Sequence, residues 1–170
     1  MADITATGRF GQALEKQQYI TFYLNNEEYA VDALNVQGII ELSNITKVPH
    51  LPEFIKGVLN LRGTIIPVLD LKLKFGMNFE EYKKHTCVII TEFKGGVMGI
   101  IADAVSDVLH MPDESVSSTP SFGTNIRTDF IKGMGKVDDR LVIILDIEKV
   151  LTHDETSLVS DMTGEEPANN

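Results

Sequence analysis

Cys87 and His85 are the two residues of this sequence whose types and spacing could support nucleophilic catalysis. On a β-strand, alternate residues share a face, so a cysteine–histidine pair is geometrically possible. Cys87 also opens an apolar run that continues through Ile90, and a cysteine in such a run most often fills space in a core. A hydrolase that uses Cys87 and His85 is therefore an alternative that the sequence leaves open but does not favour.

The other titratable residues do not form a metal site or an acid–base pair. A metal site needs ligands at short, regular spacing, whereas the histidines lie in different segments: His50, His85, His110 and His153. Asp70 and Asp146 each follow an apolar run, a position that suits helix capping, so we interpret both as caps and not as paired acids. The sequence has no glycine-rich loop of the kind that holds a phosphate. It thus predicts a non-enzymatic protein without catalytic residues, metal or cofactor.

Composition excludes several classes of partner. The 170-residue chain has a formal net charge of −10, which disfavours binding to nucleic acid and docking on an anionic membrane. Its apolar runs are too short to span a bilayer, and the start of the chain does not resemble a signal peptide. With a single cysteine, an internal disulfide is impossible. We expect a soluble, cytoplasmic protein with no nucleic-acid partner and no direct membrane insertion.

The elements that would position any site are organised by an internal repeat. Residues 54–73 read FIKGVLNLRGTIIPVLDLKL, and residues 130–149 align with them without a gap as FIKGMGKVDDRLVIILDIEK. Phe-Ile-Lys-Gly opens both copies, and Leu-Asp closes the apolar run in both. β-Branched runs on either side of a turn are typical of a hairpin. The sequence therefore predicts a duplicated hairpin that turns at Arg62-Gly63 and at Asp138-Asp139.

A weaker repeat precedes each hairpin. Residues 19–40 align with residues 88–109, and apolar and polar side chains alternate in the first strand, as expected for a half-buried strand. Each copy then has about five short strands and no long helix, which favours a small closed barrel. We expect an all-β fold with two five-stranded barrels around a shared core: barrel 1 at about 18–76 and barrel 2 at about 86–147, with strand exchange between them possible.

Short helices and tails complete the predicted organisation. Asp70 should cap a helical turn that Gly76 ends, and Asp146 should cap a helix that runs toward Leu158. Residues 1–17 read as an N-terminal arm, 18–152 as one domain, and 153–170 as a helix end with an acidic tail that is disordered from Thr163. Pro67 cannot donate to a ladder, so it should lie at an edge or bulge.

The central motif resembles a known family. Asn60-Leu61-Arg62-Gly63, within residues 54–71, is similar to the signature of the bacterial chemotaxis coupling proteins of the CheW family, and the resemblance extends over residues 19–151. It implies two SH3-like barrels and an adaptor that joins the regulatory domain of the histidine kinase CheA to the cytoplasmic tips of chemoreceptors. Such an adaptor would be cytoplasmic and recruited to membrane-associated receptor arrays. A paralogous scaffold in another sensory kinase pathway is the alternative within this family.

The resemblance also implies the contact residues. The receptor-binding groove would comprise Val36, Asn60, Arg62, Val105 and Val108, and the kinase-binding surfaces Ile40, Leu42 and Phe122. Two positions depart from many relatives, because Gly38 stands where they carry glutamate and Ser117 where some carry a basic residue.

Simpler interpretations of these residues stay open. Arg62 could be an ordinary solvated turn residue, and the three valines could be plain core. Phe122 lies in a polar loop, where an exposed aromatic side chain favours an interface.

Overall fold

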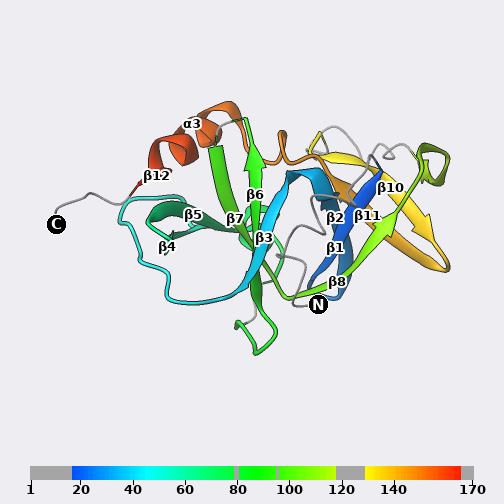
Figure 1. The fold of residues 1–170 in the computed structure, drawn as a ribbon, viewed down its shortest axis with the longest axis horizontal. Helices are drawn as coiled ribbons and strands as arrows, with labels where there is room; N and C mark the ends of the chain where they lie inside the picture. Colours follow the sequence, from blue (N-terminus) through cyan, green and yellow to red (C-terminus); the bar gives the residue numbers. More distant parts are fainter. Residues whose placement is uncertain (1–16, 79–80, 95, 118–128, 166–170) are drawn as a thin grey trace.

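Two β-sheets stand side by side in the computed structural model, which describes residues 17–78, 81–94, 96–117 and 129–165 (Figure 1). Sheet 1 has the strand order β12-β5-β7-β6-β3, with β4 also paired to β5, and sheet 2 has the order β8-β1-β2-β11-β10-β9. The predicted all-β fold class with a duplicated architecture is confirmed. The strands are β1 (Gln18–Leu24), β2 (Glu27–Asp32), β3 (Val36–Glu41), β4 (Ile55–Leu61), β5 (Thr64–Asp70), β6 (Cys87–Phe93), β7 (Gly96–Ala102), β8 (Ala104–His110), β9 (Val116–Ser117), β10 (Ile131–Val137), β11 (Arg140–Leu145) and β12 (Gly164–Glu165).

The two sheets exchange hairpins. The β1–β2 hairpin comes from the first copy of the repeat but lies in sheet 2, between β8 and β11. The β6–β7 hairpin comes from the second copy but lies in sheet 1, between β3 and β5. The ranges 18–76 and 86–147 therefore describe the copies of the repeat, and neither sheet is built from one copy alone.

The repeated hairpins occupy equivalent places in the two sheets. The β4–β5 ladder shifts register at Lys56, and the β10–β11 ladder shifts at the matching Lys132. Arg62 and Asp138, which match in the repeat, both turn with a positive φ, of 55° and 56°. β5 pairs in parallel with β7 just as β11 pairs in parallel with β2. The ungapped repeat thus corresponds to the same strand, bulge and turn in each copy.

One large apolar cluster joins the sheets. It combines Phe22 and Leu24 of sheet 2 with Ile89 and Ile100 of sheet 1, all nearly or fully buried. A smaller cluster around Leu59 belongs to sheet 1, and another, which includes Tyr19, Met111 and Val142, belongs to sheet 2. Burial of apolar surface shared by both sheets makes each depend on the other for stability.

The helices agree with the prediction at one aspartate and differ at the other. Asp70 caps α2 (Leu71–Lys74), since its carboxylate accepts a hydrogen bond of 2.9 Å from the Lys72 N–H. Asp146 caps no helix. Its carboxylate accepts from the Glu148 N–H at 3.0 Å within a turn. Helix α3 (His153–Met162) begins later, because Thr152 and Glu155 form a reciprocal capping box there.

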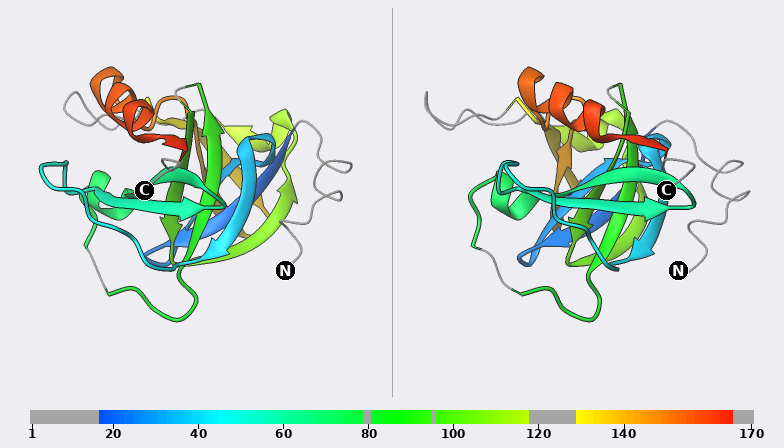
Figure 2. Two further views of the ribbon diagram at one scale, coloured as in Figure 1. Left: turned by 60° about the vertical axis from the view of Figure 1, so that its left-hand side comes forward. Right: turned by 90° about the vertical axis from the view of Figure 1, so that its left-hand side faces the viewer.

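The C-terminal segment is ordered further than the sequence indicates. Gly164–Glu165 forms β12 and pairs with Ile65 and Thr64 of β5, so disorder does not begin at Thr163. Figure 2 shows α3 and the strand that follows it lying against sheet 1. The predicted arm up to residue 16 and the tail from residue 166 lie outside the described residues.

Pro67 lies inside the sheet and not at its outer edge. It faces Val58 of β4 on one side. On its other side, β5 changes partner, from β12 at Thr64 and Ile65 to β7 from Val68 onward. The missing N–H of proline therefore coincides with a gap between two ladders.

Candidate functional site

A shallow groove runs between β3 and the tip of the β4–β5 hairpin. Its volume is about 230 Å³. Apolar side chains and backbone form most of the lining, and one cation stands at its rim. The lining residues are Gln37, Gly38, Ile39, Ile40, Leu61, Arg62 and Ile90.

Arg62 is displayed at this rim by the turn chemistry of the hairpin. Arg62 and Gly63 both have positive φ, of 55° and 87°, which is the signature of a two-residue type I′ turn. The Asn60 side-chain oxygen accepts a hydrogen bond of 2.8 Å from the Gly63 N–H and so fixes the turn. A side chain other than glycine is uncommon at positive φ. The turn therefore holds an exposed guanidinium beside a groove whose lining includes several aliphatic side chains.

The structure brings together only some of the residues that the family resemblance singled out. Ile40 and Arg62, assigned to kinase and receptor respectively, line the same groove, and Asn60 supports the turn beside it. Leu42 follows β3 and is half-buried against the sheet 1 cluster. Phe122 lies outside the described residues.

The three valines of the receptor set are core or partly core. Val36 is only 7% exposed and belongs to the cluster shared by the two sheets. Val105 and Val108 lie on β8 of sheet 2, are half-buried, and pack against the same cluster. Val105 and Val108 do not line the groove of Arg62, and they lie on sheet 2, whereas Val36 lies on β3 of sheet 1.

The two departures from relatives lie at different depths. Gly38 is buried beside the register shift of the β3–β6 ladder and lines the groove. Ser117 is exposed on β9, next to residues outside the described part of the chain.

The hydrolase interpretation of Cys87 and His85 is wrong. Cys87 is buried at the start of β6, and its thiol points to the Ala102 carbonyl oxygen at 3.9 Å. Burial, together with the nearby Asp103 carboxylate, raises the pKa of Cys87 to about 11, so little thiolate forms at neutral pH. His85 lies in the exposed turn before the strand and does not share its face.

The described residues offer neither a metal centre nor a membrane span. No three of their histidine, cysteine, aspartate and glutamate side chains gather as a metal site would require. Within the same ranges, no helix has the length and apolarity to cross a bilayer.

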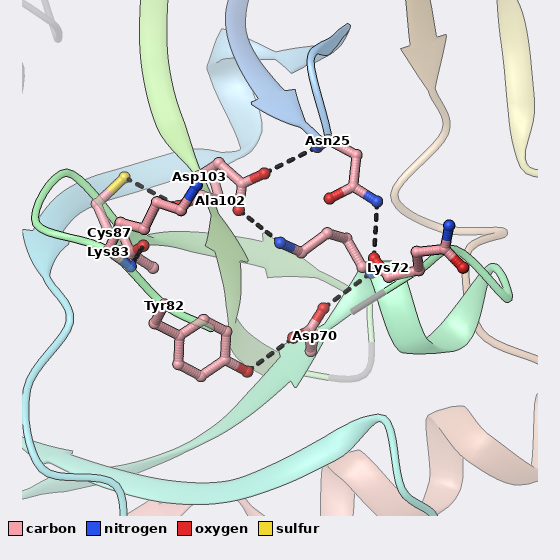
Figure 3. Close-up of polar contacts among 10 residues, drawn as sticks. Asn25, Asp70, Lys72, Tyr82, Lys83, Cys87, Ala102 and Asp103 are labelled. Atoms are coloured by element: carbon pink, nitrogen blue, oxygen red, sulfur yellow. Dashed lines mark hydrogen bonds and ion pairs between the residues drawn. The ribbon is translucent and has the colours of Figure 1, made fainter. Parts of the chain in front are cut away.

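A buried polar network is the feature that sequence reasoning missed (Figure 3). The Lys72 side chain is 2% exposed, and its ammonium group lies 2.7 Å from one oxygen of Asp103. The other oxygen of Asp103 accepts from the Asn25 N–H at 2.8 Å. The network thus ties α2 beside sheet 1 to the β1–β2 turn of sheet 2. The sequence feature that could have indicated a buried ion pair is the lysine between Leu71 and Leu73.

Tyr82 extends this polar region toward the segment before β6. Its hydroxyl donates to the Asp70 carboxylate at 2.7 Å, and burial together with this contact raises the pKa of Tyr82 far above its ordinary value. Asp70 therefore accepts from both the Lys72 N–H and the Tyr82 hydroxyl. These polar groups hydrogen-bond to one another, so we assign the network a role in stabilising the fold and not a catalytic role.

Comparisons with known proteins agree on one family. Residues 18–155 match the family model of the CheW-like domain. The chain is 38% identical over 162 residues to the chemotaxis protein CheW of Klebsiella aerogenes, an alignment that covers 95% of this chain and 98% of the relative. It is 35% identical over 142 residues to the CheW of Thermotoga maritima, covering 82% of this chain and 90% of the relative.

A solved structure gives the same result. The scaffolding protein TtCheW of Thermoanaerobacter tengcongensis superposes with a TM-score of 0.74 at 36% identity, covering 83% of this chain and 91% of that chain. The likeness extends to both sheets and both copies of the repeat, since most of each chain is aligned. This chain belongs to the family of CheW-like domains.

Proposed function

We propose that this protein is a non-enzymatic chemotaxis adaptor that couples chemoreceptors to the histidine kinase CheA. It would act in the cytoplasm, at receptor arrays, by holding the receptor tips and the regulatory domain of the kinase together. Family membership and the scaffold role named for the solved relative support this proposal.

Arg62 is the observation that carries the receptor half of the proposal. It is the one charged residue among those lining the groove, on a chain with a net charge of −10. A guanidinium can donate paired hydrogen bonds to carboxylate groups of a partner helix, while the neighbouring isoleucines offer apolar area. We assign receptor binding to Val36, Asn60, Arg62, Val105 and Val108, with Arg62 as the main polar contact.

The kinase half rests on separate surfaces. Ile40 and Leu42 lie at and beyond the end of β3, and Phe122 would act from the segment between β9 and β10. Because Ile40 and Arg62 line one groove, the kinase and receptor surfaces should adjoin at this point.

A pair of matched variants tests the assignment of Arg62. Arg62→Ala should weaken binding to a receptor-tip fragment about tenfold, since a directed charge-assisted contact is lost, and should leave the kinase regulatory domain bound. The loss should be larger at low salt than at high salt, because exposed charges are screened. Titration by isothermal calorimetry at two salt concentrations measures both effects.

Asp138→Ala is the control, because Asp138 occupies the same positive-φ turn position in the other copy of the repeat. It should bind both partners normally. Equal loss of receptor binding in the two variants would refute the groove assignment, and retained receptor binding by Arg62→Ala would do the same. Loss of CheA binding with a different sensory kinase bound instead would favour a paralogous pathway.

A further inference from the structure

Each sheet has one parallel strand pair, β5 with β7 in sheet 1 and β11 with β2 in sheet 2, and the two strands of each pair diverge at one end. We call the gap between the diverging strands the wedge of that sheet. In sheet 1, β5 pairs with β7 only from Val68 onward, so the first residues of β5 are left without β7 beside them. In sheet 2, β11 pairs with β2 only at Ile143 and Ile144, so Arg140 and Leu141 are left in the same way. The repeat aligns Arg140 with Thr64 and Leu141 with Ile65.

The chain itself fills the wedge of sheet 1. Gly164 and Glu165 of β12 pair antiparallel with Ile65 and Thr64. The Thr163 hydroxyl donates to the Val97 carbonyl oxygen of β7 at 3.2 Å. A short extended segment, delivered by α3, thus bridges the diverging strands (Figure 1).

The wedge of sheet 2 is open. Among the described residues, no strand pairs with Arg140 and Leu141 on the side away from β10. A pocket of about 380 Å³ lies here, between the start of β2 and the start of β11. Leu141 lines this pocket and is 60% exposed, so it offers apolar area to a partner there.

A buried carboxylate lines this open wedge. Glu28, the counterpart of Val97, is 7% exposed, and none of the described residues donates a hydrogen bond to its Oε2 atom. The Arg140 Nε atom lies 3.7 Å from Oε1, too far for a hydrogen bond, and is itself buried without an acceptor. The two side chains thus form an ion pair without a hydrogen bond. A buried carboxylate oxygen that accepts no hydrogen bond is destabilising, so Glu28 Oε2 is poised for a ligand that supplies a donor.

We propose that the open wedge, formed by Glu27, Glu28, Arg140 and Leu141, binds an extended segment of a partner protein that carries a lysine or arginine. The segment adds antiparallel to the start of β11, as β12 adds to β5, and the cation donates to Glu28 Oε2. Strand addition supplies main-chain hydrogen bonds, and the pocket supplies specificity. This surface is separate from the groove of Arg62.

Charge decides against a second copy of this chain as the occupant. The sequence around the strand that fills the sheet 1 wedge is acidic and contains Asp161, Glu165 and Glu166. The open wedge presents Glu27 and Glu28 against the single Arg140, so an acidic strand would be repelled and a basic one attracted.

Two synthetic peptides test the proposal with the intact, ¹⁵N-labelled protein. One has the sequence of residues 158–166, and the other carries Asp161→Lys, Glu165→Lys and Glu166→Lys in that sequence. The basic peptide should produce saturable amide shifts at Glu28, Arg140 and Leu141, and the acidic peptide should bind at least about tenfold more weakly.

Two protein variants complete the test. Glu28→Gln should weaken the basic peptide about tenfold, the loss expected for one charge-assisted hydrogen bond. Leu141→Ser, a change at an exposed side chain that should not affect folding, should weaken it severalfold. The proposal fails if the two peptides bind equally, if neither shifts Arg140 and Leu141, if the shifts fall on Thr64 and Ile65 instead, or if both variants bind as the parent does. None of these outcomes depends on receptor or kinase binding.

Discussion

The β1–β2 turn and the β6–β7 turn match in the repeat, yet different carboxylates satisfy them. The Asn25 N–H donates to Asp103, whereas the N–H of the matching Lys94 donates to Glu148. Asp103 aligns with the exposed Leu34 and Glu148 aligns with the buried Lys72, so the two acceptors come from non-equivalent positions. In both copies the backbone N–H at this turn position donates a hydrogen bond to a carboxylate, but the carboxylate comes from a different sequence position in each copy.

The same contrast appears around the repeated aspartates. Asp70 is fully buried and accepts from Lys72 and Tyr82, whereas Asp146 lies near the surface and accepts from the Glu148 N–H. Bulges, turns and pairing registers are therefore the shared framework of the two sheets. The two copies differ in their polar side chains. The Asp103 carboxylate, at the junction near α2, accepts from the Lys72 ammonium in addition to a backbone N–H, whereas Glu148, at the other junction, accepts from a backbone N–H.

Gly57→Ala should give the largest effect on this framework. Gly57 has φ of +141°, and a Cβ there would come 2.2 Å from the Thr46 carbonyl oxygen. We expect a loss of about 4 kcal/mol in the free energy of unfolding, from backbone strain and overpacking together. The matching Gly133 lacks the positive φ, and Gly133→Ala should cost about 2 kcal/mol. Urea denaturation of both variants measures the difference, and equal losses would show that the two bulges are energetically alike.

Lys72→Met should cause the second largest loss in the free energy of unfolding. It leaves the Asp103 carboxylate without the cation at 2.7 Å, and because Asp103 is partly exposed we expect about 3 kcal/mol, the low end for a broken buried pair. Glu148→Gln, at the aligned position, keeps an acceptor on the surface and should change stability by less than about 0.5 kcal/mol. The same denaturation assay applies. A cost for Glu148→Gln that matched the cost for Lys72→Met would remove the distinction between the two junctions.

Glu155→Gln should have a smaller effect than Gly57→Ala or Lys72→Met, and an effect that depends on pH. Burial alone would raise the pKa of Glu155, but hydrogen bonds from Lys74, at 2.6 and 2.8 Å, and from Thr152 lower it below the ordinary 4.5. A depressed folded-state pKa means that the stabilisation is present above the unfolded value and is lost as pH falls through the folded one.

Amide exchange of α3 measures this effect. Protection in the parent protein should decrease below about pH 4.5. Glu155→Gln should lower the free energy of opening of α3, as measured by amide exchange, by about 1 kcal/mol at neutral pH. In this variant the protection should also depend less on pH. A variant that kept the parent's full acid sensitivity would show that other carboxylates hold the helix.

Local patterns explain why much of the fold could be predicted. Alternation and turn residues mark β1 and the hairpin at Arg62, and the repeat marks its second copy at Asp138. The position of Asp146 predicts a helix that begins there, but the helix begins after Thr152, because the capping box at Thr152 and Glu155 is a stronger start signal.

Contacts between distant segments could not be predicted in the same way. Four apolar strands of similar composition could complete either sheet, so the sequence allows the exchange of hairpins without specifying it. The Lys72–Asp103 pair and the Glu28–Arg140 contact depend on that exchange. At the groove, the family resemblance indicated Ile40 and Arg62 separately, and only the fold shows that they line one surface.

Hairpin exchange also has a consequence for how the protein is made. The β1–β2 hairpin ends at Asp32, whereas its neighbour β11, which pairs Ile143 with Tyr29, begins only at Arg140. The residues between them must therefore be synthesised before sheet 2 can close, and until then the apolar hairpin lacks its neighbouring strand. The nascent chain is thus exposed to aggregation while the residues between these two elements are translated.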